Sequence, residues 1–536
     1  MCGIWAYISH NQIENFTALF DAFNKIRNRG PEVSRFNILN AQNILGFHRL
    51  GIMDPSLNGD QPFSYLRSDG SSVYLICNGE IYNYKDLISL YNLSPKSNSD
   101  CEVILEMYIK FGIDKTVREL QGEFAFIIFD VKKDKEITVH AARDAIGVRP
   151  LFYCENEEFT SFSSELKGLA TISRSIKVFP PGRVFTLNNN KSNLTTFYDY
   201  VYPKLDLGNP ETKDIYAGIR NALMNAVSRR LMTDRPFGAL LSGGLDSSLV
   251  CAIAHHLQPE IQFPVFTIAI DKNSPDLFYS KKVASYLNLK NHHIIEVTAD
   301  QALTYIDKTI YAIESWDITT VRASIMQYII GDYISKKTDV KVLLCGELSD
   351  EIHLSYLYGH FAPNATEAKK EAIRLVKDVH MFDGLRTDRT MASHGLEVRL
   401  PFSDLEYVDY FFSLPDEYFL SKNGVEKFYL RDAFKETGLL SEDVLFRKKE
   451  ALSDGISNKE RSWFEIIGEY IDTIISDEEF SPFRYLFPSK EAYYYKKKFS
   501  EYFSDSENIS NVIPYYWLPK WCGDVKNPSA RVLTNY

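Results

Sequence analysis

The segment FGALLSGGLDSS, residues 237–248, decides the fold of the second half of the chain. Its apolar start predicts a buried strand over 237–241, its glycines predict a tight loop, and a helix is expected from Ser248 to Leu257. The same alternation follows along the chain, with strands predicted at 265–270 and 340–345 and helices at 280–287 and 322–335. Alternating strands and helices indicate a parallel sheet with helices on both faces, whose ligands bind at the carboxyl ends of the strands.

The loop within this segment has the composition of an anion-binding site. The N–H groups of Gly243 and Gly244 can approach an anion, and the following helix N-terminus adds a positive dipole end. Ser242 and Ser247 supply hydroxyls, and Asp246 supplies a carboxylate that suits Mg²⁺. Together these groups predict a pyrophosphate site. The segment does not match the nucleotide loop G-x-x-x-x-G-K-[ST], so γ-phosphate transfer is not implied. A glycine-rich turn with a serine cap is the simpler alternative, but the order strand, loop, helix favours the binding site.

The first half of the chain has a different pattern. Clusters of Gly, Asn, Asp and Pro separate short apolar or alternating stretches. Strands are predicted at 72–77, 124–130 and 137–142, and a helix at 102–111. This pattern predicts a layered α+β domain. A polar, proline-bearing stretch at 202–213 indicates a linker, so we expect one domain at 2–205 and a second at 213–536.

Composition narrows the functional classes. The chain has 536 residues, with 60 basic and 71 acidic side chains and a net charge of -11, which disfavours general binding to nucleic acid or to a membrane surface. Its 7 cysteines are scattered and form no C-x-x-C pair, as is typical of a reduced intracellular protein. The start Met-Cys-Gly-Ile-Trp lacks a secretory signal, and no apolar run is long enough to span a bilayer. We therefore expect a cytoplasmic protein.

Cys2 is the first candidate catalytic residue. If Met1 is removed, Cys2 carries a free α-amino group, which titrates near ~7.7–8.0 and can accept the thiol proton. Cys2 alone is more simply read as the end of a strand. Three other polar features have equally ordinary interpretations: Arg49 as a surface ion pair, Asn78-Gly79 as a hairpin turn, and Asp100 as a helix cap.

Taken together with Arg29-Gly30-Pro31, these residues resemble the class II, N-terminal-nucleophile glutamine amidotransferases. The resemblance covers roughly the first 200 residues and implies an Ntn-hydrolase-like fold. It implies that Arg49 holds the α-carboxylate of glutamine and Asp100 its α-ammonium, while Asn78 and the Gly79 N–H form an oxyanion hole. It also implies glutamine contacts from Leu50, Gly51, Ile52, Met53 and Glu80. Glu32 replaces the aspartate usual in that family, and this change is expected to matter little.

The loop at 242–248 resembles that of ATP pyrophosphatases, and Cys2 to Asp454 as a whole is similar to the glutamine-dependent asparagine synthetases. Further matching segments are Trp316–Ser324, Glu397–Phe402 and Arg447–Glu450. The resemblance implies a doubly wound, adenine nucleotide alpha hydrolase-like second domain that uses ATP, Mg²⁺, L-glutamine and L-aspartate. It implies ATP contacts from Leu240, Ser242, Gly243, Gly244, Asp246, Ser247, Ile268, Cys345 and Gly346.

The same resemblance assigns the remaining roles. Asp246 and Asp350 would bind Mg²⁺, and Thr319 and Arg322 would seat aspartate. Lys449 would contact the α-phosphate, and Glu347 would act on incoming ammonia, which the family passes between its domains through an apolar channel. Glu397 and Arg399 would form either part of the site or a buried ion pair. A homodimer is left open.

The chain departs from the family pattern after Glu347. Leu348, Leu354 and Ser355 replace glycines, and Ala269 replaces another. If the backbone needs a positive φ at Leu348, the leucine costs ~1–2 kcal/mol and could obstruct the adenylate. Three hypotheses therefore stand: a working asparagine synthetase, a glutaminase with an impaired or redirected synthetase domain, and a non-enzymatic assembly protein on the same fold.

Overall fold

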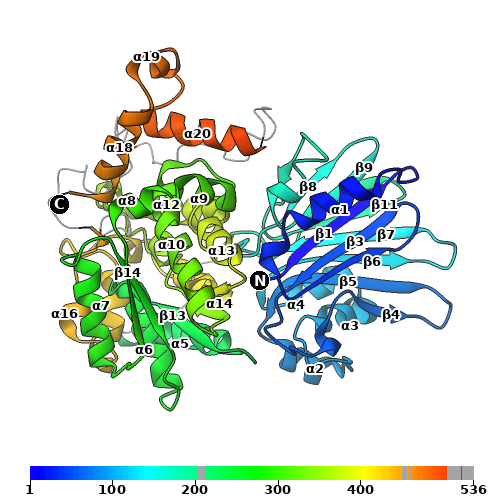
Figure 1. The fold of residues 1–536 in the computed structure, drawn as a ribbon. Helices are drawn as coiled ribbons and strands as arrows, with labels where there is room; N and C mark the ends of the chain where they lie inside the picture. The colour runs from blue at the N-terminus through cyan, green and yellow to red at the C-terminus, as the bar shows by residue number, and fades with distance from the viewer. Residues whose placement is uncertain (203–211, 450–454, 458–460, 504–520, 522–536) are drawn as a thin grey trace.

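The computed structural model describes residues 1–202, 212–449, 455–457, 461–503 and 521. An N-terminal domain of strands packs beside a C-terminal domain rich in helices (Figure 1). The predicted linker at 202–213 lies mostly outside the described residues. None of the helices in this described part of the chain is long and apolar enough to cross a membrane.

The N-terminal domain consists of two six-stranded antiparallel sheets. The first has the order β10-β8-β9-β1-β3-β2 and the second β12-β11-β7-β6-β5-β4. The first contains β1 (Gly3–Ser9), β2 (Val33–Ile38), β3 (Asn43–Arg49), β8 (Phe152–Glu155), β9 (Phe159–Ser163) and β10 (Lys177–Val178). The second contains β4 (Phe63–Leu66), β5 (Ser72–Ile81), β6 (Gly122–Val131), β7 (Ile137–Arg143), β11 (Arg183–Asn188) and β12 (Lys191–Thr196). The helices are α1 (Phe16–Asn24), α2 (Tyr84–Tyr91), α3 (Glu102–Phe111) and α4 (Ile113–Glu119).

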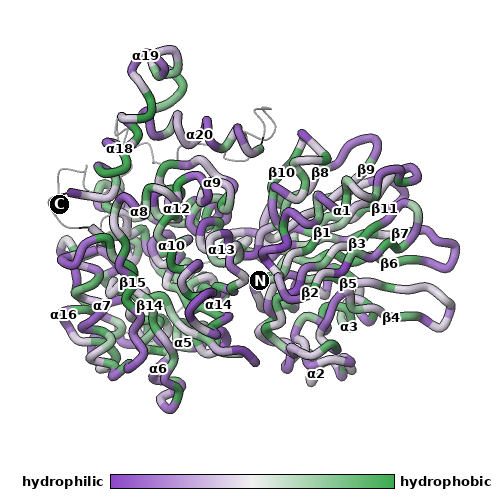
Figure 2. The backbone as a smooth tube through the Cα atoms, viewed as in Figure 1, coloured by the Kyte–Doolittle hydropathy of each residue, from purple (hydrophilic) through white to green (hydrophobic). Residues whose placement is uncertain are grey.

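Alternation along the strands builds the core between the two sheets. Ile4 and Phe47 from one sheet pack with Ile76 and Ile127 from the other. The tip of the β6–β7 hairpin is hydrophilic (Figure 2). The layered α+β prediction is confirmed, and β5, β6, β7 and α3 contain the stretches predicted from sequence.

The C-terminal domain is built on a parallel five-stranded sheet with the order β15-β14-β13-β16-β17. Its strands are β13 (Phe237–Leu240), β14 (Val265–Ala269), β15 (His292–Glu296), β16 (Val342–Leu344) and β17 (Glu397–Arg399). The chain runs outward from β13 to β15 and then returns to the other side of β13. The strand order therefore reverses between β13 and β16, where open α/β sheets bind ligands. The parallel α/β prediction is confirmed.

Helices connect and flank this sheet. The larger ones are α5 (Thr212–Arg230), α6 (Leu245–Leu257), α7 (Pro275–Tyr286), α9 (Ile306–Ile313), α10 (Ile318–Lys337), α12 (Ala365–Asp378), α13 (Asp383–Ala392) and α14 (Leu405–Ser413). Shorter ones are α8 (Ala299–Leu303), α11 (Ser349–Ile352), α15 (Phe428–Phe434) and α16 (Glu442–Leu445). The C-terminal helices α18 (Trp463–Ile474), α19 (Asp477–Phe480) and α20 (Lys490–Phe503) follow, and α20 packs on α9, α10 and α18 (Figure 1).

Candidate active sites

The position of Cys2 follows from strand pairing. Gly3 begins β1 and pairs with His48 of β3, so the preceding residue lies beside the segment that follows β3. The Cys2 Sγ is 3.5 Å from the Leu50 carbonyl oxygen, and the Arg29 Nε donates to the Cys2 carbonyl at 2.9 Å. Burial raises the pKa of the Cys2 thiol to about 12. A thiol with that pKa is not a nucleophile at neutral pH unless a base takes its proton.

Met1 is buried between the domains and is only 1% exposed. Its α-amino group lies 3.5 Å from the Leu396 carbonyl oxygen, and its sulfur contacts Arg29 and Arg149. Burial lowers the pKa of this amino group to about 6. While Met1 is present, the nitrogen of Cys2 is a peptide amide and cannot serve as the base.

Asn78 and Gly79 lie inside β5, opposite Ala125 and Phe124 of β6. The hairpin-turn interpretation is therefore wrong. Among the described residues, neither polar atom of the buried Asn78 side chain has a hydrogen-bond partner. A Cβ at Gly79 would lie 2.2 Å from the Glu123 carbonyl oxygen, so this strand position requires glycine. A side-chain amide without a hydrogen-bond partner, next to a glycine N–H, is the arrangement that an oxyanion hole needs.

Asp100 does not cap α3, whose N-cap residue is Cys101 and carries no side-chain cap. Its carboxylate instead accepts from the Ile81 N–H at 2.6 Å, at the end of β5. Burial raises the pKa of Asp100 to about 7. The helix-cap interpretation is therefore wrong, and the carboxylate is held at the end of β5, near Glu80.

Arg49 is buried, which contradicts the surface ion pair. Its guanidinium donates to the carbonyl oxygens of Ser56 and Asp54 at 2.8 and 2.5 Å, and so holds the loop that carries Ile52 and Met53. Glu32 has a larger role than predicted. It accepts from the Gly51 N–H at 2.8 Å and pairs with Arg235 of the other domain at 3.1 Å.

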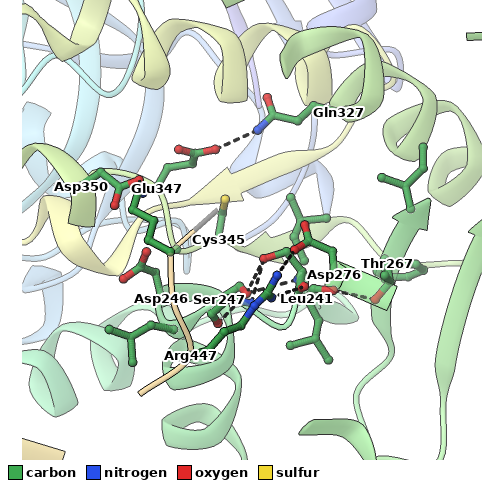
Figure 3. A pocket seen from close by; sticks show the side chains of 18 of the residues that line it. Leu241, Asp246, Ser247, Thr267, Asp276, Gln327, Cys345, Glu347, Asp350 and Arg447 are labelled. Carbon is green, nitrogen blue, oxygen red and sulfur yellow. Dashed lines mark hydrogen bonds and ion pairs between the residues drawn. The ribbon is translucent and has the colours of Figure 1, made fainter. Parts of the chain in front are cut away.

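The second site is an open cavity of about 1120 Å³ at the reversal of strand order. Its lining includes most of the residues that the sequence predicts to contact ATP and metal. They are Leu240, Ser242, Gly244, Asp246, Ser247, Ile268, Cys345, Gly346, Asp350 and Lys449. Glu347, predicted to act on ammonia, also lines the cavity (Figure 3). Gly243 is not in the lining but shapes the loop, because its φ is +73° and a Cβ there would lie 2.3 Å from the Ser280 nitrogen.

One end of the cavity is apolar, which suits a nucleobase. Leu240, Phe266, Ile268 and Ile330 line it. The other end is charged: the Lys427 Nζ lies 2.5 Å from both Asp246 and Asp350, and Lys449 also pairs with Asp350. Burial acts to raise the pKa of Asp350, but the two ammonium groups outweigh it and hold that pKa well below its usual value.

The two aspartates fit a magnesium site that substrate phosphates would complete. Both carboxylates converge on one point, the Lys427 ammonium, and Mg²⁺ is usually held by one or two carboxylates together with phosphate oxygens. The described residues contain no cluster of three or more His, Cys, Asp or Glu side chains suited to a metal. Within the described residues, Asp246 and Asp350 are therefore the carboxylate pair that fits this ion.

Glu347 lines the cavity beside Asp350 (Figure 3). The Arg386 Nη2 donates to both of its oxygens, at 3.0 and 2.9 Å, and the Gln327 Nε2 donates to one of them at 3.0 Å (Figure 3). Burial raises the pKa of Glu347, although Arg386 opposes this. The sequence predictions missed Gln327, Arg386 and Lys427. Only Gln327 could have been found from the sequence, because it lies at helical spacing from the polar residues Thr320 and Ser324 and so on the same face of α10.

Neither Thr319 nor Arg322 is in the cavity lining. Arg322 is buried and donates from its Nε to Glu491 of α20 at 2.7 Å, while Thr319 donates to Asp317 at 2.7 Å. Their assignment to aspartate binding stays a prediction. Arg399 is a buried ion-pair residue, 2.8 Å from Glu397 and 3.0 Å from Glu80 of the other domain.

Two of the four glycine replacements keep a left-handed backbone. Leu348 has φ +76° and Leu354 has φ +45°, whereas Ala269 and Ser355 are not among the residues with positive φ. The Leu348 side chain is buried in the hydrophobic core and is not in the cavity lining. The expected strain is present, but the leucine side chain does not obstruct the adenylate site.

Comparisons with known proteins cover the whole chain. The family described as Glutamine amidotransferase domain matches residues 1–202, and the family described as Asparagine synthase matches 218–377 and 361–521. A probable glutamine-hydrolysing asparagine synthetase of Acanthamoeba polyphaga mimivirus is 39% identical over 99% of this chain and 100% of its own length. The glutamine-hydrolysing asparagine synthetases of Gallus gallus and Homo sapiens are 39% and 38% identical, over 100% of this chain and 99% of theirs. The chain therefore belongs to the family of glutamine-hydrolysing asparagine synthetases.

Proposed function

We propose that this protein makes L-asparagine from L-aspartate, L-glutamine and ATP, and releases L-glutamate, AMP and pyrophosphate. One observation carries the proposal. The N-terminal domain holds the Cys2 thiol and an unmatched Asn78 amide, and the C-terminal domain of the same chain holds a cavity at the strand-order reversal that is lined by apolar and charged side chains. The first suits hydrolysis of an amide, and the second suits adenylation by ATP.

In the N-terminal site, the Cys2 thiol attacks the side-chain amide carbon of glutamine once Met1 is gone and the freed α-amino group can take the thiol proton. The oxyanion accepts hydrogen bonds from the Asn78 side chain and the Gly79 N–H. Asp100 pairs with the α-ammonium of glutamine, and Arg49 holds its α-carboxylate as well as the loop around it. Ammonia leaves, and water releases glutamate from the thioester.

In the C-terminal site, the adenine lies against the apolar end of the cavity, between Leu240 and Ile268. The β-carboxylate of aspartate attacks the α-phosphorus, and pyrophosphate leaves toward the loop at 242–248. Lys449 supplies positive charge at the α-phosphate. Asp246 and Asp350 would hold Mg²⁺, which would screen the phosphate charges when bound.

The adenylate then reacts with ammonia. The nitrogen lone pair forms a bond to the β-carbonyl carbon, the bond from that carbon to the phosphate oxygen breaks, and AMP leaves with its electron pair. Glu347 takes the proton released by nitrogen, and burial, which raises its pKa, suits it to hold that proton.

The test incubates the purified protein with Mg-ATP, aspartate and either glutamine or ammonium, and measures asparagine and pyrophosphate together. Equal amounts of both products are expected with either nitrogen donor. Glutamate release without pyrophosphate would indicate a glutaminase with a silent second domain. No reaction in either assay would favour the assembly protein.

A further inference from the structure

Gln327 is a buried polar side chain that the mechanism above does not use. It lies on α10, is only 3% exposed and lines the ATP cavity. Its Nε2 donates to Glu347, because a carboxylate offers only acceptors. The Oε1 of the same amide therefore points away from Glu347. Within the described part of the chain, that oxygen has no hydrogen-bond donor. A buried carbonyl left without a donor destabilises the folded protein, so a ligand is the expected partner.

The surroundings of Gln327 and Glu347 indicate that the ligand is a hydrogen-bond donor. The Arg386 guanidinium contacts both Glu347 oxygens within 3.0 Å and also pairs with Asp383, so one cation serves two carboxylates. The free acceptor of Gln327 is itself uncharged. An uncharged amide oxygen accepts from any N–H donor, so the position of the site in the molecule decides between the possible donors.

Helix α13 links this point to the N-terminal site. Arg386 on α13 holds Glu347, and two residues further along the same helix Asp388 pairs with Arg29 at 2.8 Å. The Arg29 Nε in turn donates to the carbonyl of Cys2 at 2.9 Å. The side of the cavity that carries Glu347 is thus the side joined to the source of ammonia.

We infer that Gln327 and Glu347 form the receiving site for ammonia, an inference that rests on the proposed function. Ammonia has three N–H donors and one lone pair. Two N–H groups donate to the Gln327 Oε1 and to a Glu347 oxygen, which leaves the lone pair directed at the adenylate carbon. Gln327 binds and orients the nucleophile, and it takes no proton.

The test replaces Gln327 by methionine in the full-length protein, which keeps the length of the side chain and removes its acceptor. With ammonium as the nitrogen donor, the KM for ammonia is expected to rise about tenfold, the value of one hydrogen bond of ~1.4 kcal/mol. Aspartate-dependent exchange of pyrophosphate into ATP, which needs no ammonia, is expected to stay within about twofold. Tyr328→Phe, which removes a hydroxyl from the next residue of α10, is the matched control and should change neither value.

Three results would overturn the inference: an unchanged KM for ammonia, a raised KM for aspartate in its place, or a parallel fall in the exchange reaction. Gln327→Asn retains the amide but shortens the side chain by one methylene. This variant should also raise the KM for ammonia, and it replaces the methionine variant in the test if that variant does not fold. If the unaltered protein itself shows no aspartate-dependent exchange, the proposed function fails, and that outcome is separate from any effect of Gln327.

Discussion

The guanidinium of Arg399, at the end of β17, lies 3.0 Å from the carboxylate of Glu80 on β5. The two residues belong to different domains, and both are buried. Burial raises the pKa of Glu80 well above its usual value, and Arg399 acts in the opposite direction. A residue predicted to contact glutamine is therefore paired directly with the sheet that carries the ATP cavity.

Arg399→Met should be strongly destabilising. It leaves Glu80 and Glu397 buried without their shared counter-charge, and breaking a buried pair in this way costs about 3–5 kcal/mol. The urea midpoint of unfolding measures the change. Arg461→Met, which breaks a pair with exposed Glu469, is the control and should cost less than about 1 kcal/mol. Equal effects of the two substitutions would show that the interdomain pair contributes no more than a surface pair.

Cys2→Ala should separate the two reactions. Without the thiol, glutamine-dependent asparagine formation is lost, whereas the rate with ammonium stays within about twofold because adenylation occurs in the other domain. Asparagine formation with each donor is the measurement. Cys154→Ala, a buried cysteine of the same domain, should retain both activities. Loss of both activities in Cys2→Ala would contradict the division into two sites.

Asp100 should make glutamine binding depend on pH. Its pKa is raised by burial to about 7, so below that pH the carboxyl is increasingly neutral and cannot pair with the α-ammonium of glutamine. The KM for glutamine should rise up to about tenfold for each pH unit below 7. Initial rates at several glutamine concentrations between pH 6 and 8 measure it.

Asp100→Asn should give a high KM with little pH dependence over the same range. The raised pKa of Asp100 also affects folding stability. The folded state binds this proton more tightly than the unfolded state, in which the pKa is near 3.8. This one group therefore favours folding as the pH falls from above 7 toward 4. A flat glutamine KM in the unaltered protein would remove Asp100 from the binding site.

At Leu348 a glycine substitution should be more stable than an alanine substitution, the reverse of the usual order. Both substitutions remove the same buried side chain, at a cost of about 2–5 kcal/mol. Only glycine also relieves the φ of +76°, so Leu348→Gly should be more stable than Leu348→Ala by about 1 kcal/mol. Urea unfolding of both variants is the measurement. At Leu344, in β16, the usual order with alanine above glycine is expected, and the same order at Leu348 would argue against strain.

The sequence predicted the features that are continuous along the chain. The pattern at 237–248 was sufficient for a strand, a loop and a helix, and the parallel sheet followed from its repetition. It could not show that Lys427 lies between Asp246 and Asp350, because those residues are 181 and 77 positions away and meet only after the chain has folded. Arg322 shows a second limit. A motif match gives the residue type, but the turn of α10 and the docking of α20 decide which way the side chain points.

The burial of Met1 sets an order of events. An aminopeptidase must bind an accessible N-terminus in its own active site. Met1 of the folded protein is only 1% exposed and lies between the two domains. For the proposed nucleophile to form, trimming has to be finished on the nascent polypeptide, before the second domain emerges and closes over it. Molecules that retain Met1 would still use ammonium but could not use glutamine. The ratio of the glutamine-dependent to the ammonium-dependent activity of a preparation therefore reports how completely Met1 was removed.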